Sequence, residues 1–148
     1  CKVKDTTPLE LEKLVFLIGA KYQQWSTSFG LKVNEMHSFS ESKLMDFIKG
    51  DKDVEEDSVR KLIGYNSRHI SRVYPKGTRV TSDNYDPSSA WDHGSQMVAL
   101  NFQTLNSAML SNWAMFSQNG SCGFVRKPSW LCGEGADVQG AQSIVITV

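Results

Sequence analysis

Three cations and a tyrosine surround one Pro-Lys-Gly turn in the segment HISRVYPKGTR, residues 69–79. The cations are Arg72, Lys76 and Arg79, and Tyr74 stands between the first two. An arginine presents a planar fork that meets phosphate oxygens in pairs, and a lysine acts as a point charge. A tyrosine can place its ring against a flat ligand while its hydroxyl stays in water. Together, these residue types suit a phosphorylated, ring-shaped ligand.

The turn belongs to a longer basic segment in a chain whose formal net charge is zero. Residues 60–79 contain six Lys or Arg and no Asp or Glu, whereas residues 51–57 contain five acids. The alternative interpretation is a solvated basic face that pairs with this acidic stretch, where each pair contributes about 0–1 kcal/mol. A nucleic-acid site is disfavoured, because the whole chain is neutral and has no recognised nucleic-acid motif. Composition alone leaves the phosphate site and the solvated face both open.

Other residues that could do chemistry give weaker signals. His37, His69 and His93 do not have the spacing with cysteines or carboxylates that is typical of a zinc site. Residues 92–95, DHGS, bring an aspartate, a histidine and a serine together. Sequence neighbours rarely form a catalytic triad, however, and no GxSxG motif surrounds the serine, so we interpret this segment as a loop before a strand. The residues by themselves offer phosphate-binding groups, but no convincing nucleophile, base or metal cluster.

The bulk composition is typical of one compact domain. The chain has 148 residues, of which 40% are apolar, and no apolar run of about 18 residues that could span a bilayer. It begins at Cys1 without a signal-peptide pattern, which suggests a processed piece. Three cysteines without a CxxC pair favour a reduced, intracellular setting, with Cys122 as a small buried residue. We interpret three tryptophans as large packing residues: Trp91, Trp113 and Trp130.

Apolar patterns predict the elements that position these residues. Continuous or alternating apolar runs predict strands at residues 14–18, 33–39, 96–102 and 143–148. Residues 58–74 predict a short helix and then a strand that ends near Tyr74, because Pro75 cannot continue a central strand. Residues 81–94 are rich in turn formers. Strands separated by helices indicate a parallel α/β unit, and the unpaired last strand indicates a part of a larger fold.

The clearest predicted helix lies in the segment SFSESKLMDFIKGD, residues 38–51. Ser38 and Glu41 have the spacing of a capping box, and Gly50 stands where a C-terminal cap is expected. We interpret Ser38 and Ser40 mainly as helix caps. A helix N-terminus also favours phosphate, so a cap and a ligand contact are compatible.

Three blocks of the chain resemble the Y region of eukaryotic phosphoinositide-specific phospholipase C. They are SFSE at residues 38–41, RHISRVYPKGTRVTSDNYDPSSAWDHGSQMVALNFQT at 68–104, and NGSCGFVRKPSWL at 119–131. The resemblance implies the second half of a TIM-type (β/α)8 barrel, incomplete without the family's X half. It divides the chain into the end of the X–Y linker (1–12), the Y region (13–131), and a connector with the first strand of a C2 domain (132–148).

The family's reaction is cleavage of phosphatidylinositol 4,5-bisphosphate into diacylglycerol and inositol 1,4,5-trisphosphate. The resemblance implies two catalytic histidines and a calcium ion, all held by the X half. This chain alone is therefore expected to contribute no catalytic residue and no metal ligand, and to be inactive. The resemblance also implies a substrate-binding role for Ser38 and Arg72 at ring phosphates, and for Tyr74 at the face of the inositol ring. For Lys76 and Arg79 we expect only a contribution to the local electrostatic field.

Two interpretations of the whole protein stay open at this point. One is a calcium-dependent enzyme of signal transduction and lipid metabolism, cytoplasmic and attached peripherally to a membrane. The other is a catalytically inactive relative that binds phosphoinositides or inositol phosphates as a scaffold. Both expect a phosphoinositide partner and no nucleic acid. The sequence of the X half would distinguish them, since loss of either histidine favours the scaffold.

Overall fold

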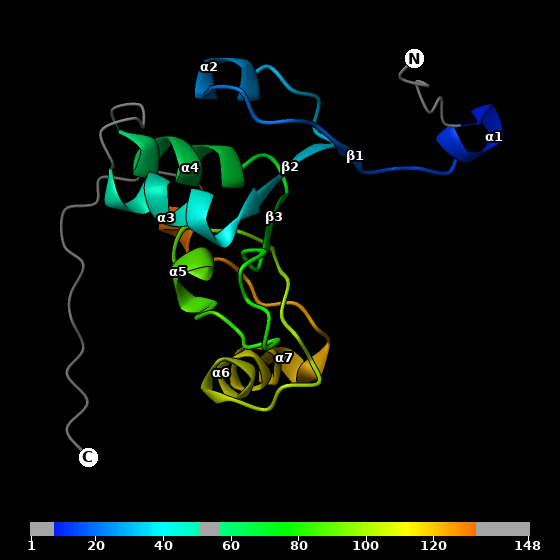
Figure 1. Ribbon diagram of the computed structural model, residues 1–148. Helices are drawn as coiled ribbons and strands as arrows, with labels where there is room; N and C mark the ends of the chain where they lie inside the picture. Colours follow the sequence, from blue (N-terminus) through cyan, green and yellow to red (C-terminus); the bar gives the residue numbers. More distant parts are fainter. Residues whose placement is uncertain (1–7, 51–56, 133–148) are drawn as a thin grey trace.

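The computed structural model describes residues 8–50 and 57–132, in which strands alternate with helices (Figure 1). The strands are β1 (Ile18–Gly19), β2 (Glu35–Ser40), β3 (Ser71–Tyr74) and β4 (Met97–Val98). The helices are α1 (Leu9–Glu12), α2 (Trp25–Ser28), α3 (Glu41–Lys49), α4 (Ser58–Asn66), α5 (Ser88–Trp91), α6 (Ser107–Phe116) and α7 (Gln118–Ser121), and a 3-10 turn follows at Ser129–Leu131.

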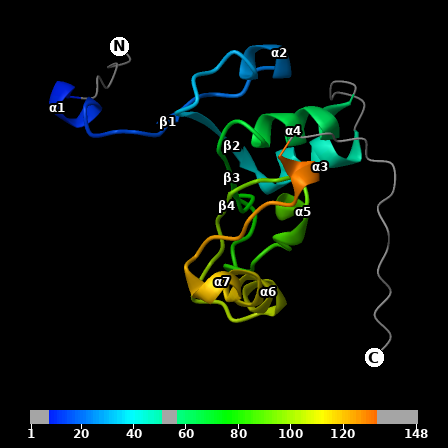
Figure 2. The same cartoon turned by 180° about the vertical axis from the view of Figure 1, so that it is seen from behind.

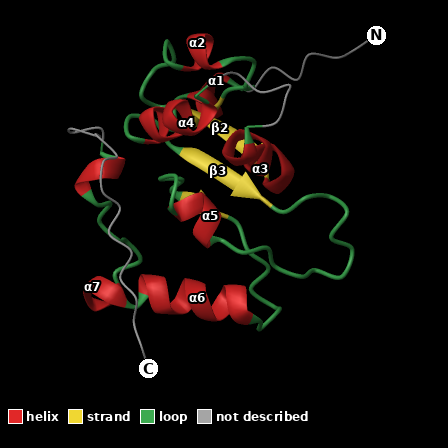
Figure 3. Ribbon diagram, turned by 90° about the vertical axis from the view of Figure 1, so that its left-hand side faces the viewer, coloured by secondary structure: helices red, strands yellow, loops and turns green. Residues whose placement is uncertain are grey.

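The four strands form one sheet in the order β1-β2-β3-β4, and every neighbouring pair is parallel. Parallel neighbours need crossover connections, which α3 and α4 provide between β2 and β3. These two helices lie against each other, and α3 packs on β2 and β3 (Figure 3). Figure 2 shows the sheet from behind, with β4 beside β3. The predicted parallel α/β unit is confirmed.

Aromatic rings form the core between the sheet and the helices α2, α3 and α4. Trp25, Phe39, Phe47 and Tyr65 are all 2% exposed or less. The Trp25 and Phe47 ring centroids lie 4.9 Å apart, and Phe47 meets Phe39 edge to face at 5.4 Å. Leu44, Leu62 and Val73 belong to the same cluster. Burial of such large rings is the dominant favourable contribution to folding on this side of the sheet.

Two of the predicted buried strands are shorter and more exposed than their apolar runs indicated. β1 contains only the last residue of the run at 14–18, and Leu14 and Phe16 are 81% and 76% exposed. β4 is a two-residue strand within the run at 96–102, and Phe102 is 69% exposed. Both strands are the edges of the sheet, so within the described residues nothing covers these side chains. The prediction of burial on both faces is therefore wrong for this part of the chain.

Helix α3 forms as predicted, and of the two serines predicted as caps only Ser40 is one. The N-cap is Ser40, whose hydroxyl accepts a hydrogen bond from the Lys43 backbone N–H at 3.2 Å. Ser38 lies two residues earlier in β2, so the predicted capping box of Ser38 with Glu41 is wrong. The reason is that β2 continues to Ser40 before the helix begins. Gly50 ends the helix with φ at 66°, in the left-handed region that favours glycine, as predicted.

Helix α6 is an element that the periodicity did not predict. Its N-cap is Asn106, whose side chain accepts from the Met109 backbone N–H at 3.2 Å. Met109 is buried, whereas Leu110 and Trp113 are 54% and 51% exposed. Apolar residues therefore lie all round the helix, and no single-sided pattern marks it in the sequence.

The predicted packing role is confirmed for Trp91 and corrected for three other residues. Cys122 is exposed rather than buried, and Trp113 and Trp130 are 51% and 43% exposed. Trp91 is half-buried and meets Phe116 edge to face at 5.9 Å. The fully buried tryptophan of the described chain is Trp25, because it lies between the sheet and two helices.

Some predictions fall on residues that the structure does not describe. They are the strand at 143–148 and most of the acidic stretch at 51–57. In the described ranges, no helix is both long enough and apolar enough to cross a membrane.

Candidate functional site

Strands β2 and β3 send alternate side chains to opposite faces of the sheet. In β2, His37 and Phe39 are buried under the helices and Ser38 between them is exposed. In β3, the first and third residues are buried, and Arg72 and Tyr74 are exposed. We call the helix-packed side the covered face and the other side the open face. All three residues predicted to bind a ligand lie on the open face.

The register of the parallel strands brings these three residues together. Ser38 pairs with Arg72, and Ser40 pairs with Tyr74. Paired residues on neighbouring strands share a face and lie about 5 Å apart. Tyr74 is the last residue of β3, so the group lies at the carboxyl ends of both strands. Active sites of TIM-type barrels lie at the carboxyl ends of the strands, so this is where the fold implied by the resemblance would place a binding site.

The Arg72 side chain is available to an anion. Its guanidinium carbon lies 5.7 Å from the centroid of the Tyr74 ring, within cation–π range. Among the described residues, no carboxylate forms an ion pair with Arg72. Tyr74 is 37% exposed, so its ring can still meet a ligand. The two side chains offer a charged fork next to an aromatic surface.

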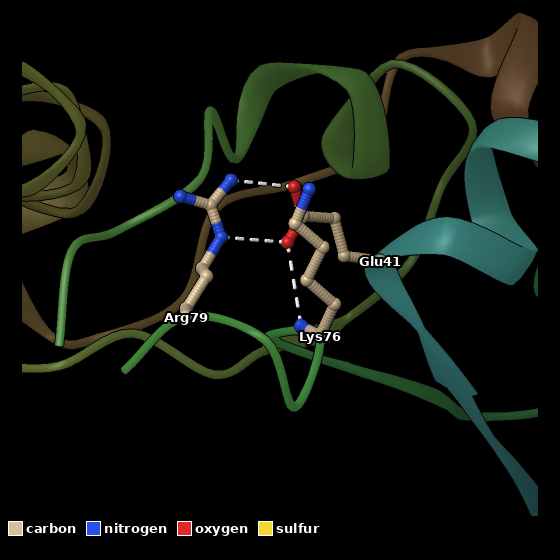
Figure 4. A network of polar contacts seen from close by, with 3 residues as sticks. All are labelled: Glu41, Lys76 and Arg79. Atoms are coloured by element: carbon tan, nitrogen blue, oxygen red, sulfur yellow. Dashed lines mark hydrogen bonds and ion pairs between the residues drawn. The ribbon is translucent and has the colours of Figure 1, made fainter. Parts of the chain in front are cut away.

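The other cations of the turn are arranged differently (Figure 4). Arg79 donates from Nε to Glu41 Oε2 at 2.8 Å and from Nη2 to Glu41 Oε1 at 2.6 Å. The Lys76 backbone N–H donates to the same carboxylate at 3.3 Å. The hydrogen bond from Arg79 lowers the pKa of the Glu41 carboxyl below its ordinary value. The basic turn therefore has an acid partner, which comes from the first turn of α3.

Sequence analysis missed this role of Glu41, which it used only for the capping box. Glu41 and Arg79 are 38 residues apart, and no motif or periodicity relates them. The available signal was a basic turn without a local acid, close to a strand that parallel pairing would place beside residues 38–41.

Two of the histidines face away from the open face. Burial lowers the pKa of the His37 imidazole, whose Nδ1 lies 2.8 Å from the Ala20 carbonyl oxygen. Its Nε2 lies 2.9 Å from Ser28 Oγ. His69 is 7% exposed and stacks on Tyr65 at 4.8 Å between centroids. Both act in the packing of the covered face.

The segment DHGS at 92–95 does not assemble a triad. His93 Nδ1 lies 2.7 Å from the Ser89 carbonyl oxygen, and Ser95 Oγ accepts from Ser71 Oγ at 3.1 Å. In the part of the chain that the structure describes, no three His, Cys, Asp or Glu side chains gather to hold a metal ion.

Neither of two hollows in the described surface is formed by the three residues together. One, of about 630 Å³, is lined by residues such as Ile70, Trp91 and Phe124, and by none of the three. A smaller hollow of about 290 Å³ touches Arg72 but neither Ser38 nor Tyr74. The candidate site is an open surface, defined by strand register and by the exposure of its side chains.

Comparison with known proteins identifies a related family. Residues 11–130 match the family model described as phosphatidylinositol-specific phospholipase C, Y domain. A 1-phosphatidylinositol 4,5-bisphosphate phosphodiesterase of Dictyostelium discoideum is 35% identical over 122 residues, which are 82% of this chain and 14% of the relative. Phosphoinositide phospholipase C 7 of Arabidopsis thaliana is 37% identical over 134 residues, which are 88% of this chain and 22% of the relative.

A solved structure is similar in fold as well as in sequence. The crystal structure of L. pealei PLC21 matches with a TM-score of 0.75 at 30% identity, and the match covers 87% of this chain and 16% of that one. The chain thus spans 14–22% of the length of these three proteins.

Proposed function

This chain belongs to the phosphatidylinositol-specific phospholipase C family, and we propose that the whole protein hydrolyses phosphatidylinositol 4,5-bisphosphate to diacylglycerol and inositol 1,4,5-trisphosphate. In this proposal, the Y region supplies recognition of the headgroup. The observation that carries it is the register of β2 and β3, which pairs Ser38 with Arg72 and places Tyr74 beside them on the open face.

Each of the three residues has a defined task in this proposal. The Arg72 fork donates hydrogen bonds to a phosphate on the inositol ring, and charge-assisted bonds of this kind are about twice as strong as neutral ones. The Tyr74 ring packs against the face of the inositol ring, and the Ser38 hydroxyl donates to a ring phosphate. The exposure of all three supports these tasks, as does the lack of a described carboxylate paired with Arg72.

We also propose that the four strands are one half of an eight-stranded barrel, and that the X half comes from elsewhere in the protein. The order β1-β2-β3-β4 supports this, since consecutive parallel strands are how such barrels are built. The exposed apolar residues at both edges of the sheet also support it, because an X half would cover them. Leu14, Phe16 and Phe102 are examples.

The remaining expectations belong to the same proposal. The X half carries the catalytic histidines and the residues that hold calcium. Residues 132–148 lead into a C2 domain, and the protein acts in signalling at the cytoplasmic face of a membrane, where its lipid substrate lies. Calcium dependence is checked by assaying the whole protein with and without a calcium chelator.

The central experiment compares two arginines of the basic segment in the whole protein. Arg72→Ala is expected to cost about 1–3 kcal/mol in kcat/KM on the bisphosphate, the scale of a lost hydrogen bond to a charged group. It should cost much less on unphosphorylated phosphatidylinositol, which lacks the ring phosphate. Arg68→Ala is the matched control, since Arg68 is exposed in the turn between α4 and β3, outside the proposed site. Equal losses on both lipids would remove Arg72 from the ring-phosphate site.

A second measurement distinguishes the enzyme from a scaffold. If the whole protein binds inositol 1,4,5-trisphosphate but does not hydrolyse the lipid with calcium present, the inactive relative is the correct interpretation. The isolated 148-residue chain should show no hydrolysis under any of these conditions. Turnover by the purified chain would contradict the assignment of the catalytic residues to the X half.

A further inference from the structure

The Glu41 carboxylate connects the start of α3 to the turn after β3. Glu41 is the first residue of α3, directly after Ser40. Its two oxygens accept three hydrogen bonds from the turn after β3, two from Arg79 and one from the Lys76 backbone (Figure 4). Such a two-pronged pair fixes direction as well as distance, because the guanidinium fork is planar.

This ion pair is better protected from water than an ordinary surface pair. The Arg79 and Glu41 side chains are 22% and 15% exposed. The hydrogen bond to Arg79 lowers the pKa of Glu41, and the same contact raises the pKa of Arg79. Both groups therefore stay charged at neutral pH. Partial shielding weakens the screening by salt that makes most surface pairs ineffective.

The pair lies next to the residues of the proposed site. Ser40, the last residue of β2, pairs with Tyr74 of β3. Glu41 is the residue directly after Ser40. The turn that it binds begins at Pro75, which has no N–H group and cannot continue the ladder of β3. The bonds within the turn are local, as from the Arg79 N–H to the Lys76 carbonyl oxygen at 3.1 Å.

The next firm attachment of this loop to β3 comes later in the chain. The Tyr85 hydroxyl donates to the Val73 carbonyl oxygen at 3.2 Å, and Tyr85 is 5% exposed. Arg79 lies about midway between Tyr74 and Tyr85, so its bond to Glu41 divides this long loop into two shorter segments. Each shorter segment has fewer conformations than the undivided loop.

The same geometry distinguishes Arg79 from Arg72. Both nitrogens on one edge of the Arg79 guanidinium, Nε and Nη2, already donate to Glu41. This edge is therefore not available for a two-pronged contact with a phosphate, and the carboxylate already matches the charge of Arg79. Among the described residues Arg72 has no such ion pair, so its whole guanidinium is available to an anion.

We propose that Glu41 and Arg79 are positioning residues: their ion pair fixes the loop after β3 against the start of α3, so that Tyr74 and Arg72 face the ring of a phosphorylated ligand. Arg79 also neutralises the charge of the Glu41 carboxylate, which would otherwise repel an anion bound at the neighbouring Arg72 and Tyr74. This inference rests on the proposed function, since it concerns the same site.

The experiment measures the ratio of kcat/KM on the bisphosphate to kcat/KM on unphosphorylated phosphatidylinositol in the whole protein. Arg79→Met is expected to lower this ratio by roughly tenfold, the scale of one lost charge-assisted hydrogen bond. A merely structural role would lower turnover on both lipids by the same factor and leave the ratio unchanged. Arg68→Met is the matched control and should leave both values unchanged.

Variants of both partners distinguish the loss of the ion pair from the effect of an unpaired charge. Glu41→Gln should lower the ratio less than Arg79→Met does, because it leaves no unpaired carboxylate beside the site. The double variant with both changes should recover part of the loss of Arg79→Met, which would demonstrate coupling between the two residues. Arg79→Lys, which keeps the charge, should recover part of the ratio as well.

Binding of free inositol 1,4,5-trisphosphate, measured by calorimetry on the same variants, gives a readout that does not depend on turnover. If Arg72→Ala weakens binding and Arg79→Met does not, the positioning role is wrong while the proposed function stands. If neither variant changes the affinity or the lipid ratio, the proposed site itself is wrong and the inference falls with it. A loss on both lipids in equal proportion would also overturn the positioning role.

Discussion

The two faces of the β2–β3 pair carry residues of the same strands under opposite constraints. On the covered face, Phe39 and Val73 are 2% and 0% exposed within the aromatic core. On the open face, Ser38, Arg72 and Tyr74 are exposed. A shift of one residue in either strand would exchange the two sets. The difference shows that packing constrains residue identity on the covered face, whereas in the proposed function the chemistry of a ligand constrains it on the open face.

The largest expected effect tests the covered face. Phe39→Ala removes a buried ring that touches Phe47, so we expect a loss of about 3–5 kcal/mol in stability. Hydrogen–deuterium exchange of peptides that cover residues 35–49 in the whole protein measures this local stability. Ser38→Ala, the neighbour on the open face, should change the same exchange by less than about 0.5 kcal/mol. Similar losses in both variants would break the division into two faces.

The two serines at the end of β2 sharpen the comparison. Ser40 caps α3, so Ser40→Ala should destabilise that helix by about 1 kcal/mol, as typical N-cap replacements do. Exchange rates of amides in α3 provide the measurement. Ser38→Ala should leave α3 unchanged and reduce affinity for inositol 1,4,5-trisphosphate instead. If the two variants have the same profile, the assignment of separate tasks to these residues is wrong.

Within the open face, Tyr74 and Arg72 should differ in what they recognise. In the proposed function, the ring of Tyr74 packs against a part of the ligand that all inositol lipids share. Tyr74→Ala should therefore reduce kcat/KM by about 1 kcal/mol on the bisphosphate and on unphosphorylated phosphatidylinositol alike. Tyr74→Phe keeps the ring and should lose little. A phosphate-selective loss in Tyr74→Ala, like that expected of Arg72→Ala, would mean that the two residues act as one unit.

Sequence patterns predicted local features of this fold better than long-range ones. The helix and strand at residues 58–74 follow from apolar spacing and from Pro75, and Gly50 ends α3 as its position indicated. Both Ser38 and Ser40 were predicted as caps and only Ser40 is one, because the two serines have the same chemistry and only the length of β2 separates their roles. Burial at 14–18 and 96–102 could not be predicted from the runs alone, since burial depends on which neighbours cover an edge strand.

The candidate site shows the same limit. Ser38, Arg72 and Tyr74 were found through motifs, and the strand register then explains why residues 34 positions apart are neighbours. The partnership of Glu41 with Arg79 has only an indirect sequence signal, the basic turn without a local acid, because the contact depends on how a loop folds back over a helix start. Contacts of this kind are a property of the assembled fold.

The smallest expected effect is a pH dependence that separates the two faces. Burial lowers the pKa of His37 on the covered face below its ordinary value of 6.5, and the nearby His69 acts in the same direction. The unfolded chain therefore binds a proton at a higher pH than the folded chain, so the stability that neutral His37 contributes is present above pH 6.5 and is lost as the pH falls below it. The lowered pKa of Glu41 acts in a different pH window, since the stability that its carboxylate contributes is lost only below about pH 4.5.

Thermal unfolding of the whole protein, monitored by hydrogen exchange in β2, should show stability falling from pH 7 to pH 5. His37→Gln should flatten this slope even if it lowers stability at every pH. Arg79→Met should leave the slope between pH 7 and pH 5 unchanged, because its partner titrates lower. An unaltered slope in His37→Gln would place the acid sensitivity elsewhere than on the covered face.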